Sequence, residues 1–421
     1  MKTIHINLIS DQLLPNIILT FTDNLCHGCV LVFGDDSLHH KGEILTRIYN
    51  GREIPVLYRS EGTSSHRLTQ LKKQANQLLE WLSLHHADKH WILNATCGTK
   101  PMALAFVNAF NHFNNVHPES AKEGIPQALI LYTDSQNREL PILNDGVDHS
   151  WQWRSVMTLP EILEANGFEY SDYINHENDH DIHGRTALTH RISKSFNAPQ
   201  GNSLQGALQH AATTAFKQFA TCPTQSLPIS VINNFTILGR HLVQAGMIEW
   251  DEQTQDITFL SEDACRYLSG RWLEELTYLI AKECGFKHVA MSVAGKWQTT
   301  ALHSGSEQGK NNEFDVLICH NNQLLTIECK AKNFGNTTGY EASNPGTTEY
   351  ETSNQDTVLK LESLSRKLGG LFGERLLVSS HKVPDAMEQR LKDNHIDLCQ
   401  SAGTQEINAS LRTFFNKMDS K

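Results

Sequence analysis

Asn312-Glu313-Phe314-Asp315-Val316 and Leu325-Thr326-Ile327-Glu328-Cys329-Lys330 are the two segments that decide the fold of the C-terminal part of this 421-residue chain. Both segments are mostly apolar, and a short Asn-containing turn separates them, so the pattern predicts a β-hairpin over residues 313–330. The first strand carries an acid, and the second ends in Glu-x-Lys. Two carboxylates and an ammonium at neighbouring hairpin positions can hold a divalent metal ion beside an activated water. That is the minimal apparatus for cutting a phosphodiester bond.

Each polar residue of this hairpin has an expected role. Asp315 and Glu328 are candidate ligands for Mn²⁺ or Mg²⁺, because hard oxygen donors suit these ions. Lys330 lies on the same sheet face as Glu328, since side chains repeat every two residues along a strand. Its ammonium can orient or help deprotonate the attacking water, and the carbonyl of Cys329 is a possible further ligand. The alternative, a hairpin with solvated surface charges, fits poorly with the surrounding apolar residues.

A helix expected over residues 271–284 precedes the hairpin and supplies a further acid. Its apolar residues fall on one face. Glu274 lies opposite this apolar stripe and Glu275 flanks it, so helical geometry alone favours Glu275 as the acid that faces the sheet. The rest of this C-terminal unit is expected to contain a strand at 289–293, a polar loop at 333–354 that is a candidate substrate gate, a helix at 356–368, a strand at 375–379 and a final αβα stretch.

The middle of the chain has a different pattern. Residues 171–203 are rich in His, Asn, Asp, Ser and Gly, which predicts a long loop or linker. Residues 230–245 are predicted to be helical, and 247–250 and 256–260 to be strands. This order is that of the C-terminal half of a winged helix, which serves either as a DNA reader or as a spacer or dimer contact.

The first ~150 residues alternate strand and helix patterns, which predicts a doubly wound α/β domain with a parallel sheet. Ligands of such domains bind at the carboxyl ends of the strands. The expected strands are 3–9, 29–33, 54–58, 90–93 and 128–132, with a possible edge hairpin at 139–143 and 151–153, and the expected helices are 38–49, 68–86 and 101–113. The chain is thus divided into an N-terminal unit (1–153), a middle linker with the winged-helix-like segment (154–266) and a C-terminal unit (267–421).

Two polar loops follow strands of the N-terminal unit, at residues 10–16 and 94–102. The second is a Gly/Thr-rich turn that opens a helix, and it offers free backbone N–H groups to a phosphate. Lys100 adds a cation, and Pro101 fits the first helical turn. By spacing alone, an ordinary tight strand-to-helix turn explains the pattern equally well.

Composition bounds the function only loosely. The net charge of −11 argues against a protein that coats nucleic acid, more than against an enzyme whose metal site is itself acidic. Neither a signal-peptide pattern nor an apolar run long enough to cross a bilayer is present, which predicts a cytoplasmic protein.

The order of Glu274, Asp315 and Glu328-Cys329-Lys330 resembles the PD-(D/E)xK nuclease superfamily. The local strings 270–274 and 312–316 resemble more specifically the CRISPR-associated CARF nucleases of the Card/Can type, which are activated by cyclic oligoadenylate. The resemblance implies a restriction-endonuclease-like fold for residues 267–421. It also implies that Glu274 is the helical acid, against the geometric preference for Glu275. The P in the superfamily's name stands for a proline before the aspartate, and this chain has Phe314 at that position.

The two N-terminal loops resemble the ligand loops of the Rossmann-like CARF domain, in which a cyclic oligoadenylate lies across the two-fold axis of a homodimer. The resemblance implies phosphate and ribose contacts from Thr99, Lys100 and backbone amides, and adenine contacts from Gln12 or Asn16. A cyclic tetra-adenylate suits a dimer with two equivalent halves. Cys97 stands where such families carry a second glycine. The implied ligand-binding residues are Ser10, Asp11, Gln12, Asn16, Thr96, Gly98, Thr99, Lys100 and Met102.

The leading hypothesis is therefore a homodimeric nuclease of type III CRISPR antiviral defence that cyclic oligoadenylate activates and that cleaves DNA, RNA or both with Mn²⁺ or Mg²⁺. One alternative is a constitutive restriction or repair nuclease, in which the N-terminal domain is a scaffold. Another is a ligand-sensing transcription regulator that uses the winged-helix-like segment. The complete set of Asp315, Glu328 and Lys330 disfavours the regulator, because a regulator does not need a metal site.

Overall fold

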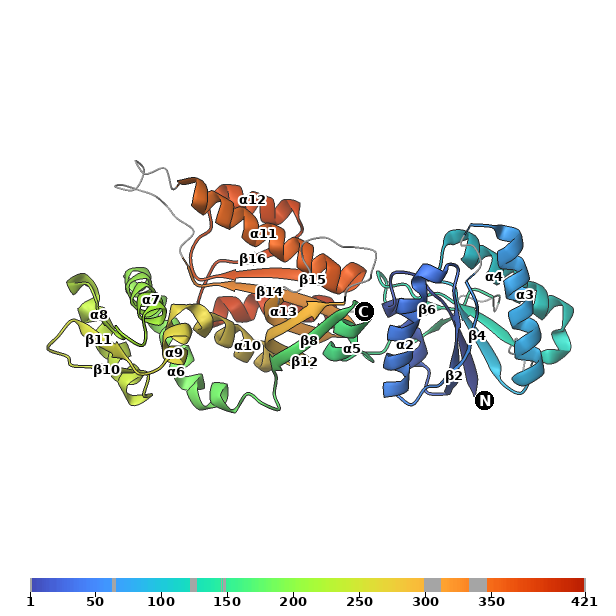
Figure 1. Ribbon diagram of the computed structural model, residues 1–421, viewed down its shortest axis with the longest axis horizontal. Helices are drawn as coiled ribbons and strands as arrows, with labels where there is room; N and C mark the ends of the chain where they lie inside the picture. Colours follow the sequence, from blue (N-terminus) through green and yellow to red (C-terminus); the bar gives the residue numbers. More distant parts are fainter. Residues whose placement is uncertain are drawn as a thin grey trace.

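The computed structural model describes residues 2–62, 66–121, 127–144, 146, 149–298, 312–332 and 347–419, and for 347–356 and 371 it describes the backbone alone. The molecule is elongated (Figure 1). The N-terminal sheet lies at one end, the C-terminal sheet in the middle, and a small sheet with α7 and α8 at the other end.

The N-terminal unit is a five-stranded parallel sheet in the order β3-β2-β1-β4-β5, which confirms the predicted doubly wound fold. Its strands are β1 (Thr3–Leu8), β2 (Cys26–Val32), β3 (Val56–Arg59), β4 (His90–Asn94) and β5 (Ala128–Leu131). Its helices are α1 (Leu14–Thr22), α2 (His39–Gly51), α3 (Leu68–His85) and α4 (Lys100–Val116), with the short turns η1 (Asp36–Leu38) and η2 (Pro118–Ser120). The strand order reverses between β1 and β4, and this is where ligands of such sheets bind.

Helix α1 was not predicted, although its neighbours were. It is a short helix of nine residues that is buried on nearly every side, and its sequence is mostly apolar, so it is hard to tell from a buried strand. The predicted edge hairpin forms from β6 (Leu140–Pro141) and β7 (Ser150–Trp151).

Helix α5 (Leu159–Ala165) connects the N-terminal unit to the rest of the chain. Its N-terminus carries a capping box made by Thr158 and Glu161. Arg52 of α2 binds Glu161 with its Nε at 2.6 Å and its Nη2 at 3.0 Å, and Arg47 Nε lies 2.8 Å from Glu164. Two ion pairs therefore join α2 to α5.

The C-terminal unit contains a six-stranded mixed sheet in the order β16-β15-β14-β13-β12-β8. Its strands are β8 (Phe168–Ile174), β12 (His288–Trp297), β13 (Asn312–His320), β14 (Gln323–Lys330), β15 (Gly373–Ser379) and β16 (Asp397–Cys399). Helices α10 (Trp272–Cys284), α11 (Thr347–Gly369), α12 (Asp385–Asp393) and α13 (Thr404–Asp419) pack around it, with η4 (Gly370–Phe372) before β15. The predicted hairpin, the 271–284 helix and the final αβα order are confirmed. Of the predicted gate at 333–354, residues 333–346 lie outside the described residues and 347–354 belong to α11.

The loop predicted over residues 171–203 is wrong. Strand β8 occupies 168–174 and pairs with β12 as the edge of the sheet, and α6 (His180–Phe196) and α7 (Gly201–Lys217) follow. The polar composition gave a wrong prediction for β8 because β8 is an edge strand, and its side chains are mostly exposed. The remaining middle elements are β9 (Thr224–Ser226), α8 (Ile229–Gln244), β10 (Ile248–Trp250), β11 (Asp256–Phe259), α9 (Glu262–Arg266) and a π-helical turn, η3 (Tyr267–Arg271). The predicted helix, strand, turn, strand order from α8 to β11 is confirmed.

Buried side chains link the units. One cluster includes Leu13 and Leu14 beside β1 together with Leu368 and Phe372 near the end of α11. Arg138 also donates from Nη1 to the Met418 carbonyl of α13 at 2.6 Å. Within the described part of the chain, no helix combines the length and apolar character needed to cross a bilayer.

Candidate functional site

The turn between β13 and β14 sets the register of the acid-bearing hairpin. Asn321 and Asn322 both have positive φ, 49° and 64°, as a two-residue type I′ turn requires. The Asn322 side chain is buried, and its Oδ1 accepts hydrogen bonds from the backbone N–H groups of Val156 and Met157 at 2.8 and 3.0 Å. In this register Val316 pairs with Ile327. Asp315 and Glu328 are the next residues away from the turn on the two strands, so they lie side by side.

Lys330 joins the two carboxylates. Its Nζ forms an ion pair with Glu328 Oε1 and lies 3.7 Å from Asp315 Oδ2. Asp315 Oδ2 also accepts a hydrogen bond from the Cys329 N–H at 2.6 Å. The Cys329 side chain points to the other face, where its Sγ contacts Thr277 Oγ1 of α10 at 3.6 Å. The structure thus brings together the three charged hairpin residues that the sequence singled out.

One carboxyl of this cluster, that of Asp315, resists ionisation. Burial first, and then the neighbouring Glu328, raise the pKa of Asp315 to about 7. Burial alone would lower the pKa of Lys330, but Asp315 and Glu328 raise it above its ordinary value, so the ammonium stays charged. Like charges set side by side in a sheet are unfavourable unless a cation offsets them.

Glu274, and not Glu275, lies beside this cluster. Burial, followed by the charges of Asp315 and Glu313, raises the pKa of Glu274 well above its usual range. Glu275 is completely buried on another side of α10, where it pairs with Arg185 of α6. The geometric preference for Glu275 was therefore wrong, because the helix that covers this side of α10 was expected to be a loop.

A cavity of about 540 Å³ opens beside these residues. Glu274, Lys330 and the Cys329 position line it, whereas Asp315 and Glu328 lie behind Lys330. The sequence analysis had missed several of its charged lining residues: Asp172, Arg266, Arg271 and Lys332. Asp172 lies on β8, which was expected to be a loop, and Arg271 lies on the π-helical turn before α10.

The chemistry of the cluster fits a hard divalent cation. Within the described residues, no three His, Cys, Asp or Glu side chains are arranged to hold a metal ion by themselves. Asp315 and Glu328, however, supply two oxygen donors, and Mg²⁺ commonly binds one or two carboxylates together with water and phosphate. Burial and then the charge of Glu328 raise the pKa of Asp315, and a bound cation would favour its ionised form.

The two N-terminal loops lie next to each other at the carboxyl ends of β1 and β4. The Cys97 Sγ donates to the Gln12 carbonyl at 3.5 Å and so links the loops. Gly98 has φ of +80°, and Thr99 caps α4 by accepting the Met102 N–H at 3.4 Å. Lys100, which follows in the first turn of α4, is exposed.

The other predicted ligand-binding residues divide into surface and interior groups. Asn16 is buried, and its amide is used internally: Nδ2 donates to the Leu8 carbonyl and Oδ1 accepts from Asn94, both at 3.0 Å. Met102 is also buried. Both residues lie in the interior beneath the loops. Of the two candidates for an adenine contact, Gln12 and Asn16, Gln12 is therefore the better placed. The half-buried or exposed positions are Ser10, Asp11, Gln12, Thr96, Gly98, Thr99 and Lys100.

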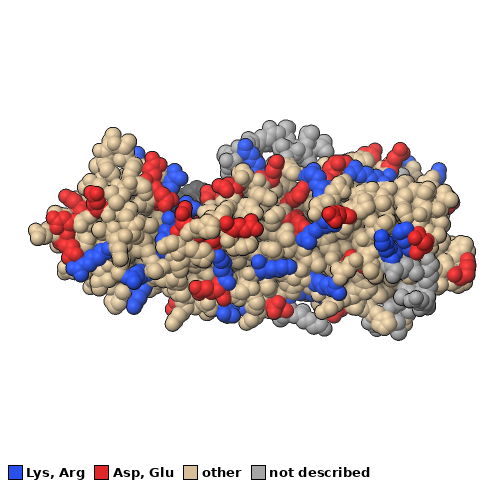
Figure 2. All heavy atoms as spheres, turned by 90° about the horizontal axis from the view of Figure 1, so that it is seen from below, with Lys and Arg blue, Asp and Glu red and all other residues tan. Residues whose placement is uncertain are grey.

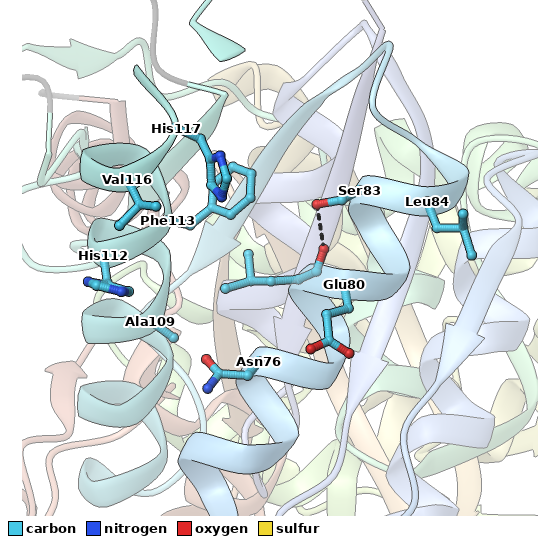
Figure 3. Close-up of a pocket in the computed structure, with 10 residues that line it drawn as sticks. Asn76, Glu80, Ser83, Leu84, Ala109, His112, Phe113, Val116 and His117 are labelled. Carbon is cyan, nitrogen blue, oxygen red and sulfur yellow. Dashed lines mark hydrogen bonds between the residues drawn. The ribbon is translucent and has the colours of Figure 1, made fainter. Parts of the chain in front are cut away.

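A second cavity, of about 610 Å³, lies between α3 and α4 (Figure 3). It is lined by Asn76 and Glu80 of α3, by His112 and Phe113 of α4, and by His117 just after α4. It lies toward the C-terminal end of α4, whereas Lys100 lies at the N-terminal end, so it is separate from the loops. Figure 2 shows acidic and basic side chains interspersed over the face it displays.

The fold and the site define a protein with a Rossmann-like N-terminal domain and an endonuclease domain. The family of Card1 CARF domains matches residues 4–119, and the family of Card1-like endonuclease domains matches residues 261–418. Together these matches identify the chain as a CARF-domain nuclease of the Card/Can type. No curated protein matches it.

Two solved structures share the fold over nearly the whole chain. Protein VC1899 from Vibrio cholerae is 21% identical, with a TM-score of 0.75 and coverage of 99% of this chain and 97% of that one. Can2 from Sulfobacillus thermosulfidooxidans, solved in complex with cyclic tetra-adenylate, is 19% identical, with a TM-score of 0.69 and coverage of 98% and 99%. At sequence identities this low, the likeness to these two structures shows a shared fold and nothing more.

Proposed function

We propose that this chain is a metal-dependent endonuclease of type III CRISPR antiviral defence that cyclic oligoadenylate activates in the cytoplasm. The observation that carries the proposal is the cluster of Asp315, Glu328 and Lys330 beside an open cavity, in a domain of the Card1-like endonuclease family. The Card1 CARF match over residues 4–119 supports a ligand-switched enzyme over a constitutive one.

In the proposed site, Asp315, Glu328 and the Cys329 carbonyl hold Mn²⁺ or Mg²⁺. Such an ion, when bound, acidifies a water molecule and offsets charge on the phosphate. Lys330 keeps its proton, because both carboxylates raise its pKa. Beside a bound ion, its ammonium would orient the attacking water and offset charge on the phosphate. Glu274 contributes a fourth polar side chain, at the wall of the cavity.

The proposed activator is cyclic tetra-adenylate, bound across the two-fold axis of a homodimer. Thr99, Lys100 and the amides at the start of α4 would contact phosphates, where the helix N-terminus favours anions. Ser10, Asp11, Thr96 and Gly98 complete the loops, and Gln12 would meet an adenine edge. Moving a 1:99 equilibrium to 99:1 takes about 5.5 kcal/mol of preference for the active state. A four-phosphate ligand held by two subunits is a reasonable source of that preference.

The test is cleavage of labelled single-stranded RNA, single-stranded DNA and supercoiled plasmid with Mn²⁺, with and without cyclic tetra-adenylate. We expect cleavage only with the ligand, and loss of cleavage to background in Asp315→Ala. Asp397→Ala is the matched control, because Asp397 is an exposed acid on β16 of the same sheet. Lys100→Ala should raise the ligand concentration needed, and Lys72→Ala, an exposed lysine of α3, should not.

Cutting that needs no ligand would reduce the N-terminal domain to a scaffold. Cutting that persists in Asp315→Ala would contradict the proposed metal site. Absence of cutting on all three substrates would contradict the nuclease and favour the alternative of a ligand-sensing transcription regulator.

A further inference from the structure

Helices α6 and α10 are joined by a buried ion pair next to the active site. Glu275 is completely buried, and the Arg185 side chain is only 17% exposed. Arg185 Nε donates to Glu275 Oε2 at 2.8 Å and its Nη2 donates to Oε1, so the contact is bidentate. Two parallel bonds of this kind fix the orientation as well as the distance of the two groups.

The guanidinium of Arg185 is held in place from further sides. Its Cζ lies 4.8 Å from the centre of the Tyr267 ring, and its Nη1 donates to Asp263 Oδ2 at 3.2 Å. The other oxygen of Asp263 lies 3.7 Å from Arg271 Nη1, and Arg271 lines the catalytic cavity. The Tyr267 hydroxyl in turn bonds Thr189 of α6 at 2.7 Å. Arg185 is thus the centre of a polar network that reaches the cavity wall.

Stability alone is a weak reason for such a pair. Burying two charges costs about as much as their attraction returns, and an apolar pair of similar size is often as stable. What the pair supplies is a fixed rotation of α10 about its axis. Because Glu274 is adjacent to Glu275, that rotation decides whether the Glu274 carboxylate faces the cavity.

We propose that Arg185 is a positioning residue of the nuclease: by holding Glu275, it fixes the rotation of α10 and directs Glu274 into the active-site cavity. The inference rests on the proposed function. It gives the middle segment a role, since α6 follows β8 directly and both pack on the C-terminal unit. The segment is then part of the catalytic apparatus and not a passive linker.

The test compares Arg185→Met and Arg185→Lys with the wild type in ligand-activated cleavage. We expect Arg185→Met to lower kcat by roughly 10- to 100-fold with little change in KM, because a displaced catalytic group costs rate more than binding. Arg185→Lys keeps the positive charge but cannot form two parallel hydrogen bonds to Glu275. Its kcat should therefore lie between those of Arg185→Met and the wild type.

Lys282→Met is the matched control. Lys282 and Tyr278 of α10 both donate to Asp179 at 2.6 Å, just before α6. They link the same two helices, and Lys282 lies about two turns along α10 from Glu274. Lys282→Met should lose stability and keep kcat. Circular dichroism and the melting temperature give the folded fraction of each variant.

Equal loss of kcat in Arg185→Met and Lys282→Met would reduce the pair to ordinary helix packing and overturn the inference. A crystal structure of Arg185→Met answers the same question without activity. Glu274 should have left the cavity wall, and Glu274 still in place would refute the positioning role. A wild-type protein that does not cleave would contradict the proposed function instead, and the crystal structure would still decide the inference.

Discussion

Asp315 is a buried carboxyl beside a second carboxylate, and its raised pKa makes a pH prediction. In the folded chain it holds its proton up to about pH 7, whereas an unfolded Asp releases it near pH 4. Between these values the folded state binds more protons, so its stability falls as pH rises. In metal-free buffer, we expect the free energy of unfolding to fall between about pH 4 and pH 7, by a few kcal/mol at most, and to level off above pH 7. Asp315→Asn should remove most of this fall in urea titrations.

Mn²⁺ provides the counterpart to this experiment. A cation bound to the ionised carboxylate favours the charged form, so the wild type should be stabilised by Mn²⁺ at pH 8 and Asp315→Asn should gain much less. A stability that rises with pH in the wild type without metal would show that Asp315 is already ionised in the folded state.

At the residue scale, the sequence located the hairpin charges correctly because alternation along two apolar strands is a local signal. It could not choose between Glu274 and Glu275. That choice depends on Arg185, which lies 90 positions away and packs on α10 only in the folded chain. The same reason explains why Asp172 and Arg271 were missed at the cavity wall.

At the element scale, β8 and α6 make a prediction about fragments. Phe168 of β8 packs its ring against Trp297 and Phe314, with centroids 5.1 and 5.3 Å apart. A fragment of residues 267–421 lacks this strand and also lacks α6, so it exposes the side of α10 that α6 covers and removes the partner of Glu275, Arg185. We expect this fragment to lose cooperative thermal unfolding, and residues 154–421 to keep it.

Differential scanning calorimetry of the two fragments is the measurement, with the full chain as reference. A cooperative transition in 267–421 at the temperature of the longer fragment would show that the middle segment is dispensable for the fold of the nuclease unit. The sequence could not give this boundary, because an edge strand with one buried end and exposed polar residues has no alternating pattern.

At the scale of the whole molecule, the first ligand loop contacts the nuclease unit directly. A Cβ on Gly370, in η4 at the end of α11, would lie 3.1 Å from Gln12 Nε2. Leu13 and Leu14, beside Gln12, share one buried cluster with Leu368 and Phe372. The sequence predicted both units but not this contact, because the local sequence of one segment contains no signal of its contact with the other.

The contact predicts that a substitution in the nuclease unit changes ligand affinity. Gly370 has φ of +53°, a conformation that costs an L-residue about 1–2 kcal/mol, and its new Cβ would crowd Gln12. Gly370→Ala should therefore displace the Gln12 side chain and weaken binding of cyclic tetra-adenylate, by roughly 5- to 30-fold for a cost of this size. The measurement is direct ligand binding in an Asp315→Asn background, which excludes effects of cleavage.

Gly369→Ala is the control, one residue away. Gly369 has an ordinary φ of −105°, and a Cβ there would meet only Leu324 at 3.8 Å, so it should leave affinity unchanged. Coupling between two sites is reciprocal, so a turn that alters ligand affinity must itself respond to the ligand. Since η4 leads into β15, which pairs with β14 alongside Glu328 and Lys330, this turn would carry the response toward the active site. Equal affinities in both glycine variants would exclude this route and leave the other described connections, among them the ion pairs to α5 and the Arg138–Met418 hydrogen bond.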